Sequence, residues 1–205
     1  MRNSSFILTL LLVSMSMNKG LAQNTIDREF ISAIKEAKTR IQSISCQFEQ
    51  TVVMSVLSDK EKSSGNFYFR TPGQLKWEQL TPDNYTLVIN GDQSYKMDGK
   101  EKKSLPAGAM QLVGFRRFIM GTLDGSIFDS DHFDTDIAKT EMDWEISMLP
   151  VKKALSKRFD KIQLTFDQKE MLLQQMTFFE LGGDQRIIRF KNHEINTLTD
   201  DTNFQ

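Results

Sequence analysis

The sequence predicts a mainly β domain of the α+β kind, built as a curved antiparallel sheet with one apolar face. From residue 46 almost to the end, short runs rich in β-branched and aromatic residues are bounded by turn-forming residues, as is typical of strands. Between residues 64 and 90, three such runs heavy with aromatic residues are joined at two proline turns. Within most runs apolar and polar side chains alternate, which places one apolar stripe on each strand.

Residues 1–22 have the three parts of a secretory signal peptide. Arg2 lies in a short polar start, residues 6–13 form an apolar run, and the segment ends on small residues up to Ala22. The apolar run is shorter than the about 20 residues that a membrane-spanning helix needs. We therefore expect export, cleavage near Ala22 and a single mature domain over residues 23–205, with a retained amphipathic anchor as the alternative.

The net charge and the cysteine content argue against a nucleic-acid-binding protein and against an internal disulfide. The signal holds two of the 26 basic residues and none of the 27 acidic ones, so the mature chain has a formal net charge of −3. This charge argues against a protein dedicated to nucleic acids. Cys46 is the single cysteine, so no internal disulfide can form, and we expect it to be a small buried apolar residue.

The segment 25–43 is predicted to be an amphipathic helix. Its apolar residues recur at spacings of three and four, which gives one buried stripe, and neither proline nor glycine interrupts it. The stripe consists of Ile26, Phe30, Ala33, Ile34, Ala37 and Ile41.

The pattern of short runs predicts eleven strands in antiparallel order. Short glycine-containing turns at residues 71–73, 90–92 and 181–184 are of the kind that joins hairpins. We interpret the charged segments 59–62 and 99–103 as hairpin ends. The predicted strands are residues 46–56, 65–70, 74–79, 85–90, 93–97, 132–137, 143–149, 161–167, 172–181, 185–191 and 194–198.

A second helix is predicted over residues 105–123, where apolar residues are too closely spaced for alternation. Gly108, Gly114 and Gly121 weaken this helix. Two interpretations remain open: a loosely held, movable cover over the sheet, or a plain connecting helix that fills the core.

No grouping of residues predicts catalysis or metal binding. His132 and His193 are the only histidines, and neither belongs to a zinc-ligand motif. A nucleophilic pair of Cys46 with a histidine has no local signature, and no glycine-rich phosphate loop or GxSxG motif occurs. The acidic cluster over residues 124–136 does not follow the order of a calcium loop. We therefore expect no enzyme, no cofactor and no metal.

The alternation gives the sheet an apolar face that must be buried against something. The two predicted helices can cover it, and they either fill the space completely or leave a pocket. The apolar stripes are Phe67 and Phe69, Leu75 and Trp77, Leu87 and Ile89, Trp144, Ile146 and Met148, Ile162, Leu164 and Phe166, Met176 and Phe178, and Ile188 and Phe190.

Several motifs, taken in order, resemble the LolA family of periplasmic carriers of outer-membrane lipoproteins. The pattern F-x-Q before a long strand is present at residues 48–50, G-x-h-x-h-x-R-P-x-x-h-x-W is approached at residues 65–77, and an apolar strand ends in Asn-Gly at residues 90–91. Residues 144–150 are similar to its W-x-L-x-P stretch, and residues 181–192 to its D-x-x-G-Q motif. The order and spacing of these pieces carry the resemblance, which covers most of the mature chain.

This resemblance implies a curved, unclosed half-barrel in the periplasm, with helices over its concave face and lipoprotein acyl chains held between them. It also implies loading by an inner-membrane ABC-type exporter, delivery to an outer-membrane acceptor, and a monomeric carrier. On this basis we expect a lipid-binding cavity lined by Phe67, Phe69, Leu75, Trp77, Leu87, Ile89, Ile146 and Met148. On the lid side we expect Phe30, Ile34, Phe115 and Phe118.

The chain departs from the family pattern at the arginine that precedes the proline and is thought to hold the lid. Thr71 occupies this position and Arg70 precedes it, so strict alternation places the two side chains on opposite faces. We therefore do not carry the lid-holding role over to Arg70, and we expect at most a weak lid contact from Thr71. Two alternatives stay open, a LolA-like carrier of another lipid or glycolipid and a cell-envelope module that binds proteins.

Overall fold

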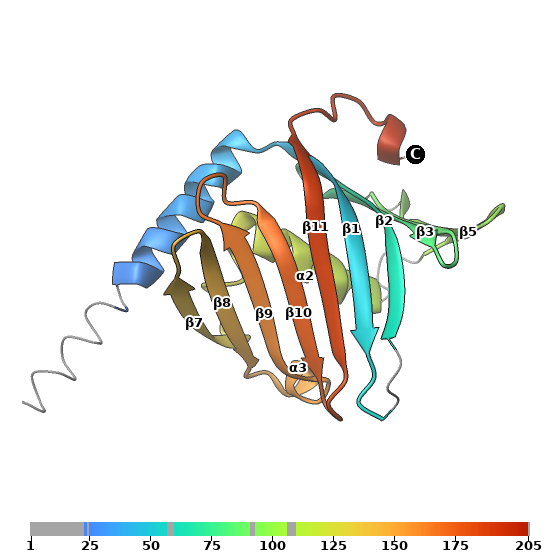
Figure 1. Cartoon of the computed structure of the whole chain (residues 1–205). Helices are drawn as coiled ribbons and strands as arrows, with labels where there is room; N and C mark the ends of the chain where they lie inside the picture. Colours follow the sequence, from blue (N-terminus) through green and yellow to red (C-terminus); the bar gives the residue numbers. More distant parts are fainter. Residues whose placement is uncertain (1–22, 24, 57–59, 91–92, 106–109, 205) are drawn as a thin grey trace, which may run out of the picture.

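The computed structural model describes residues 23, 25–56, 60–90, 93–105 and 110–204, and within it eleven strands form one antiparallel sheet (Figure 1). The strands are β1 (Ser43–Val53), β2 (Lys60–Arg70), β3 (Gln74–Thr81), β4 (Tyr85–Ile89), β5 (Tyr95–Asp98), β6 (Glu101–Ser104), β7 (Phe133–Lys139), β8 (Asp143–Pro150), β9 (Phe159–Asp167), β10 (Leu173–Glu180) and β11 (Gln185–Ile195). Their order is β6-β5-β4-β3-β2-β1-β11-β10-β9-β8-β7. The sheet is not closed, since β6 and β7 are its two edges.

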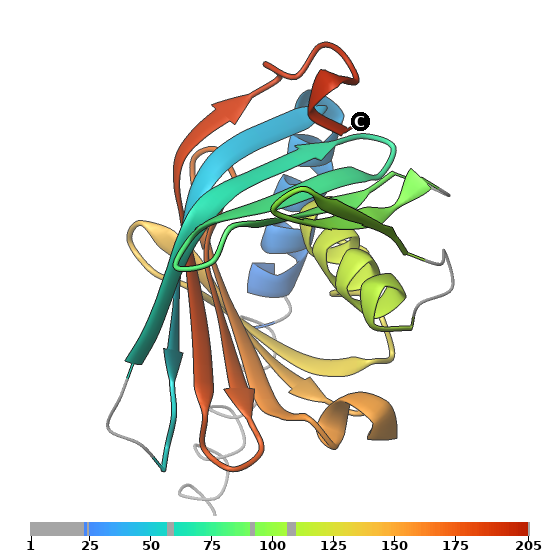
Figure 2. The same cartoon turned by 90° about the vertical axis from the view of Figure 1, so that its right-hand side faces the viewer.

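The sheet curves around two helices, as Figure 2 shows. The N-terminal helix (residues 25–40) and α2 (Met110–Asp124) both lie against the concave face. The short helix α3 (Lys153–Ser156) joins β8 to β9, and the 3-10 turn η2 (Thr202–Phe204) ends the described chain. The predicted architecture, a curved unclosed sheet with helices on its concave side, is confirmed.

Strand alternation builds the main core between sheet and helices. In β9, Ile162, Leu164 and Phe166 are buried while the residues between them are partly exposed. From the N-terminal helix, Phe30 and Ile34 enter the same cluster and are almost completely buried. Apolar stripes of period two from the strands and of period 3.6 from the helix therefore meet in one core.

Asn196 fixes where the N-terminal helix ends relative to the sheet. Its side-chain amide donates to the carbonyl of Arg40 at 2.9 Å, and its side-chain oxygen accepts from the backbone N–H groups of Gln42 at 2.7 Å and Ser43 at 3.2 Å. The bond to Arg40 satisfies a carbonyl that the helix end leaves without an intrahelical partner, and the other two bonds fix the chain just after the helix. The residue just after β11 thus joins the helix to the start of β1.

The C-terminal segment packs on the convex face. Arg70 donates to the carbonyl of Asp200 at 2.5 Å, forms an ion pair with Asp201, and lies over the ring of Phe204 with 5.3 Å to its centroid. Phe204 is buried in a second, small cluster with Val88. Arg70 therefore holds the end of the chain and points away from the helices.

Several predicted boundaries are corrected by the structure. No separate strand runs over residues 194–198, because β11 stays paired with β1 as far as Ile195. Residues 101–104 form the edge strand β6, although their charges suggested a hairpin end; edge strands tolerate such charges because their outer side faces solvent. In the same way β2 begins at Lys60, within a predicted hairpin end.

The helices also differ in extent from the prediction. The N-terminal helix ends at residue 40 instead of 43, because residues 43 onward pair in β1. The second helix is described from Met110 to Asp124, while Leu105 still bonds to the sheet through its N–H and the carbonyl of Ser94 at 2.9 Å. The short helix α3 was not predicted. Among the described residues, no helix is both long and apolar enough to cross a bilayer; residues 1–22, the predicted signal, lie outside them.

Candidate functional site

A cavity of about 320 Å³ lies between the helices and one end of the sheet. Its wall is mostly apolar and comes from the end of the N-terminal helix, the end of α2, the β1–β2 region, and the turn between β9 and β10. The lining residues are Ala37, Lys38, Ile41, Ile44, Phe69, Thr71, Pro72, Met120, Leu123, Asp124, Phe166, Met171 and Leu173.

The turn between β9 and β10 is held in place by Asp167. Its carboxylate accepts from the backbone N–H groups of Glu170 at 2.7 Å and Leu172 at 2.9 Å. Met171 has a positive φ of 57° within this turn. Local bonds of an aspartate with the backbone that follows it are a common way to shape a turn. They bring Met171 and the start of β10 to the cavity wall.

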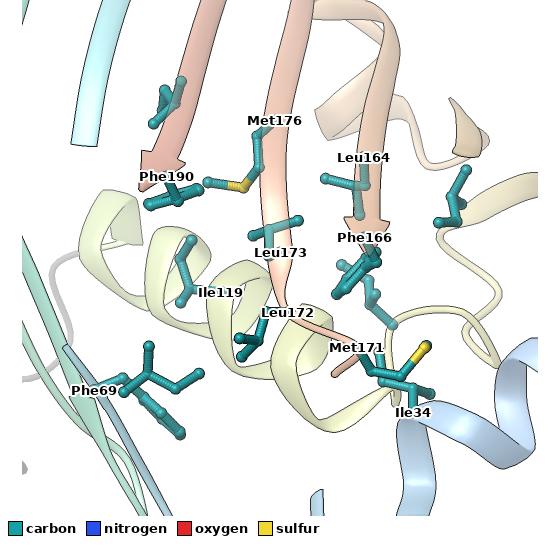
Figure 3. Packing of buried hydrophobic residues seen from close by; sticks show 14 of the residues in the cluster. Ile34, Phe69, Ile119, Leu164, Phe166, Met171, Leu172, Leu173, Met176 and Phe190 are labelled. Carbon is teal, nitrogen blue, oxygen red and sulfur yellow. The ribbon is translucent and has the colours of Figure 1, made fainter. Parts of the chain in front are cut away.

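Figure 3 shows α2 passing across the start of β10, with Ile119 on the helix and Leu172 and Leu173 on the strand side. Ile119, Leu172 and Leu173 are all buried. Ile34 and Met171 lie near the other end of this row in the same view. Where α2 passes the start of β10, its contact with the sheet is therefore apolar.

Charged and polar groups gather at the mouth of the cavity. Lys38 of the N-terminal helix and Asp124 at the end of α2 form an ion pair with 3.6 Å between Nζ and Oδ2, and both are partly exposed. Beside them, Thr71 donates through Oγ1 to Oε1 of Gln42 at 3.0 Å. The Lys38–Asp124 pair is thus a polar contact that joins the two covering helices.

The turn after α2 is packed tightly against the N-terminal helix. Gly125 has a φ of 78°, and a Cβ atom placed there would lie only 2.8 Å from Cγ2 of Ile34. Only glycine fits both the backbone conformation and the close approach without strain. This contact holds the end of α2 beneath the N-terminal helix.

A second cavity, of about 20 Å³, adjoins the first one and shares Ile44, Leu123 and Leu173 with it. Cys46 and His193 also line it. Burial raises the pKa of the Cys46 thiol to about 12, so the group is a neutral thiol.

The imidazole of His193 is half-buried in the wall of this second cavity. Burial lowers the pKa of His193, while the contact of Nε2 with the carbonyl of Leu173 at 3.1 Å and the charge of Asp167 oppose that effect. Neutral groups therefore face the second cavity, which suits an apolar occupant.

Some of the predicted cavity residues line a cavity in the structure, and the others lie in the packed core. Phe69 lines the large cavity and Phe67 the small one. Trp77 is buried and stacks on Phe48 at 3.8 Å between ring centroids. The remaining predicted cavity residues lie in the packed core, where Leu75, Ile89, Ile146 and Met148 are buried and Leu87 is half-buried.

The predicted lid residues belong to the two helices that cover the sheet. Phe30 and Ile34 are buried in the core, and Phe118 is half-buried against the rings of Phe133 and Phe178. The side chain of Phe115 lies outside the described part of the chain. Thr71 contacts Gln42, which follows the N-terminal helix, and lines the large cavity.

Sequence reasoning missed most of the cavity wall. Ala37, Ile41 and Phe166 belong to apolar stripes that the sequence predicts. The sequence does not show which residues of a stripe border a cavity and which are packed against other side chains. Met171 and Leu173 come from a turn and from the start of a strand, where the alternating pattern is too short to be recognised.

Among the described residues, no group of three or more His, Cys, Asp or Glu side chains could hold a metal ion.

Comparisons with known proteins give a consistent result. The family model of the outer membrane lipoprotein carrier protein LolA matches residues 39–205. An outer-membrane lipoprotein carrier protein of Pseudoalteromonas translucida (strain TAC 125) is 24% identical over 183 residues, which cover 84% of this chain and 80% of that protein.

Solved structures share the fold at low identity. An uncharacterized conserved protein from Thermus thermophilus has a TM-score of 0.56 and 9% identity, with 87% of this chain and 92% of that chain covered. MucB has a TM-score of 0.53 and 14% identity, and the match covers 87% of this chain and 62% of MucB. At these identities the likeness extends to the fold alone.

Proposed function

Because the chain belongs to the LolA family of outer membrane lipoprotein carrier proteins, we propose that it carries lipoprotein acyl chains through the periplasm in the cavity between its helices and its sheet. The observation that carries this proposal is the apolar cavity of about 320 Å³ at the end of the concave face. Pockets that hold small molecules measure about 300–1,000 Å³, so the cavity is large enough to admit part of an acyl chain.

The energy of binding comes from the apolar wall. Each methylene removed from water contributes about 0.8 kcal/mol, so ten buried methylenes contribute roughly 8 kcal/mol before the entropy of immobilising the chain is subtracted. Leu123 and Leu173 border both cavities, so an acyl chain that enters at the mouth extends toward Phe67.

A complete lipoprotein anchor needs more room, so we propose that the covering helices move away from the sheet during loading. The ion pairs between the N-terminal helix and the rest of the protein, such as Lys35 with Asp129 and Lys38 with Asp124, are partly exposed. Exposed pairs contribute about 0–1 kcal/mol each, so they guide closure without preventing opening. The predicted site residues Leu75, Trp77, Leu87, Ile89, Ile146 and Met148 become accessible to cargo in the open state.

The partners follow from this role. We propose that an inner-membrane ABC-type exporter loads the monomeric carrier and that an outer-membrane acceptor takes the cargo. Acceptance requires a site that binds the acyl chains better than the carrier does, since a ligand shifts an equilibrium only by its difference in affinity.

Substitution of Ala37 tests the cavity directly. Ala37 lies on the cavity wall, so the Ala37→Met side chain occupies space that the acyl chain needs. Ser32→Met places the same side chain on the exposed side of the same helix and serves as the matched control. We expect Ala37→Met to weaken binding of a fluorescent fatty acid at least tenfold and Ser32→Met to leave it unchanged. Equal binding by both variants would remove the cavity as the site.

Mass spectrometry identifies the cargo. Organic extraction of the mature protein, purified from its own periplasm, should release acylated molecules, and less of them from Ala37→Met. Recovery of lipoprotein supports the proposed cargo, while recovery of a glycolipid or another lipid alone assigns the carrier to that molecule.

A further inference from the structure

One end of the half-barrel combines exposed apolar side chains with a cluster of cations. This end, which we call the α3 end, contains α3, the β10–β11 turn and the end of β1, at the bottom of Figure 1. Four of the six large apolar residues that are exposed in the described chain belong to it. They are Val56, Leu149, Val151 and Leu181.

Hydrogen bonds join these segments into one continuous surface. The N–H of Leu181 donates to the carbonyl of Arg158 at 3.0 Å, which links the β10–β11 turn to the segment after α3. Ser55 donates through Oγ to the carbonyl of Gly182 at 2.7 Å and through its N–H to Asp184 at 2.8 Å. The β10–β11 turn, which carries Leu181, is therefore joined both to the segment after α3 and to the end of β1 beside Val56.

The charges of the α3 end differ from those of the whole chain. Residues 152–161 contain five basic side chains and one acidic one, whereas the complete chain has a formal net charge of −1. Lys152 is paired with Asp131, and the β10–β11 turn adds the acidic Asp184. Lys153 and Lys157 are exposed, and no ion pair is recorded for either within the described residues. Arg158 and Lys161 lie over the rings of Phe159 and Phe179, at 5.0 and 4.5 Å from the centroids.

We propose that the α3 end docks on the surface of a bilayer that contains anionic phospholipid. Basic side chains are attracted to anionic headgroups, and exposed apolar side chains beside them enter the interface, as in peripheral membrane proteins. Lys153, Lys157 and Arg158 contact the headgroups, and Val151 and Leu181 enter between them.

Docking in this orientation leaves the cavity free. The cavity mouth lies beside Ile44 and Phe69, which pair with each other at one end of the β1–β2 ladder, whereas Val53 and Lys60 pair at the other end. The α3 end is on the side of Val53. A docked molecule therefore presents its cavity mouth away from the bilayer, where a membrane-bound partner can reach it.

Vesicle flotation tests the proposal with the mature chain. We expect the protein to float with phosphatidylcholine vesicles that contain phosphatidylglycerol, not with phosphatidylcholine alone, and to be released by added salt. The double variant Lys153→Gln/Lys157→Gln should bind the anionic vesicles roughly 30-fold more weakly, because each basic residue near the surface changes partitioning about fivefold.

A matched variant separates local from general charge effects. Lys100→Gln/Lys169→Gln removes the same charge from two exposed lysines outside the α3 end, and it should bind vesicles as the parent does. Val151→Ser/Leu181→Ser should also bind more weakly. Failure of the parent to float with anionic vesicles, or equal weakening by both lysine pairs, would overturn the proposal and leave the α3 end to a protein partner.

Binding of a fluorescent fatty acid keeps this test independent of the proposed cargo. The substitutions at the α3 end should leave fatty-acid binding unchanged, because no residue of this end lines the large cavity. A protein that carries no acyl chains can still dock, so the two proposals fail separately.

Discussion

Phe30 is a fully buried apolar contact between the N-terminal helix and the sheet, and its replacement tests how this helix is held. Its side chain is completely buried. The ring centroid lies 5.1 Å from that of Phe128, 5.5 Å from Trp144 and 5.7 Å from Phe166, all at steep interplanar angles. Such edge contacts favour binding of the helix beyond the burial of area alone.

The expected cost follows from these contacts. A buried Phe→Ala substitution lowers the free energy of unfolding by about 3–5 kcal/mol, through lost transfer energy and the cavity that remains. Phe30→Leu keeps most of the burial and loses the three ring contacts, so we expect about 1.5–2 kcal/mol. Domains have free energies of unfolding of about 5–15 kcal/mol, so Phe30→Leu should stay folded, while Phe30→Ala consumes most of the stability of a domain at the lower end of this range.

Urea unfolding followed by tryptophan fluorescence measures both variants, since Trp144 adjoins Phe30. The control is Phe179→Ala, because Phe179 is only partly buried and should cost about 1 kcal/mol. The slope of the free energy with urea should stay constant. A loss below about 1.5 kcal/mol for Phe30→Ala, or a loss no larger than that of Phe179→Ala, would refute the view that Phe30 holds the helix.

Three further predictions concern other parts of the fold. Arg70→Gln should release the C-terminal segment from its contacts with Asp201 and Phe204, so limited proteolysis should remove this segment faster while fatty-acid binding persists; unchanged proteolysis would contradict this role. Because burial lowers the folded-state pKa of His193, the unfolded chain binds the proton more tightly, so stability present above pH ~6.5 should fall as the pH drops through that value. His193→Gln should reduce this pH dependence in urea titrations, and an unaltered pH profile would count against it. Cys46 should react with a thiol reagent at least about 100-fold more slowly in the folded protein than in urea, and equal rates would disprove its burial.

Several features of the molecule follow from the sequence alone. Alternation in runs such as 67–69 and 162–166 predicts one apolar face for the sheet, because a period of two puts every second side chain on the same side. The stripe of the N-terminal helix, with Phe30 and Ile34, predicts what covers that face. The ordered motifs also indicate the LolA family.

The extent and pairing of individual strands could not be predicted as reliably as the apolar face of the sheet. Residues 101–104, three of which are charged, form β6 because backbone hydrogen bonding depends little on side-chain polarity at an exposed edge. The strand β11 continues past Asn192, whose φ of 55° marks an irregularity in the ladder and not its end. These outcomes depend on the partner strand, which a local pattern does not contain.

The amino-acid sequence by itself determined that this protein has an apolar concave face and helices to cover it. The tertiary structure decided where that cover is incomplete: Leu75 and Met148 are packed into the core, while Phe69, Met171 and Leu173 border open space. All five side chains are apolar, and the sequence does not distinguish those that are packed from those that border the cavity. A cavity is the volume left after distant segments pack, so its position depends on contacts that no single segment encodes.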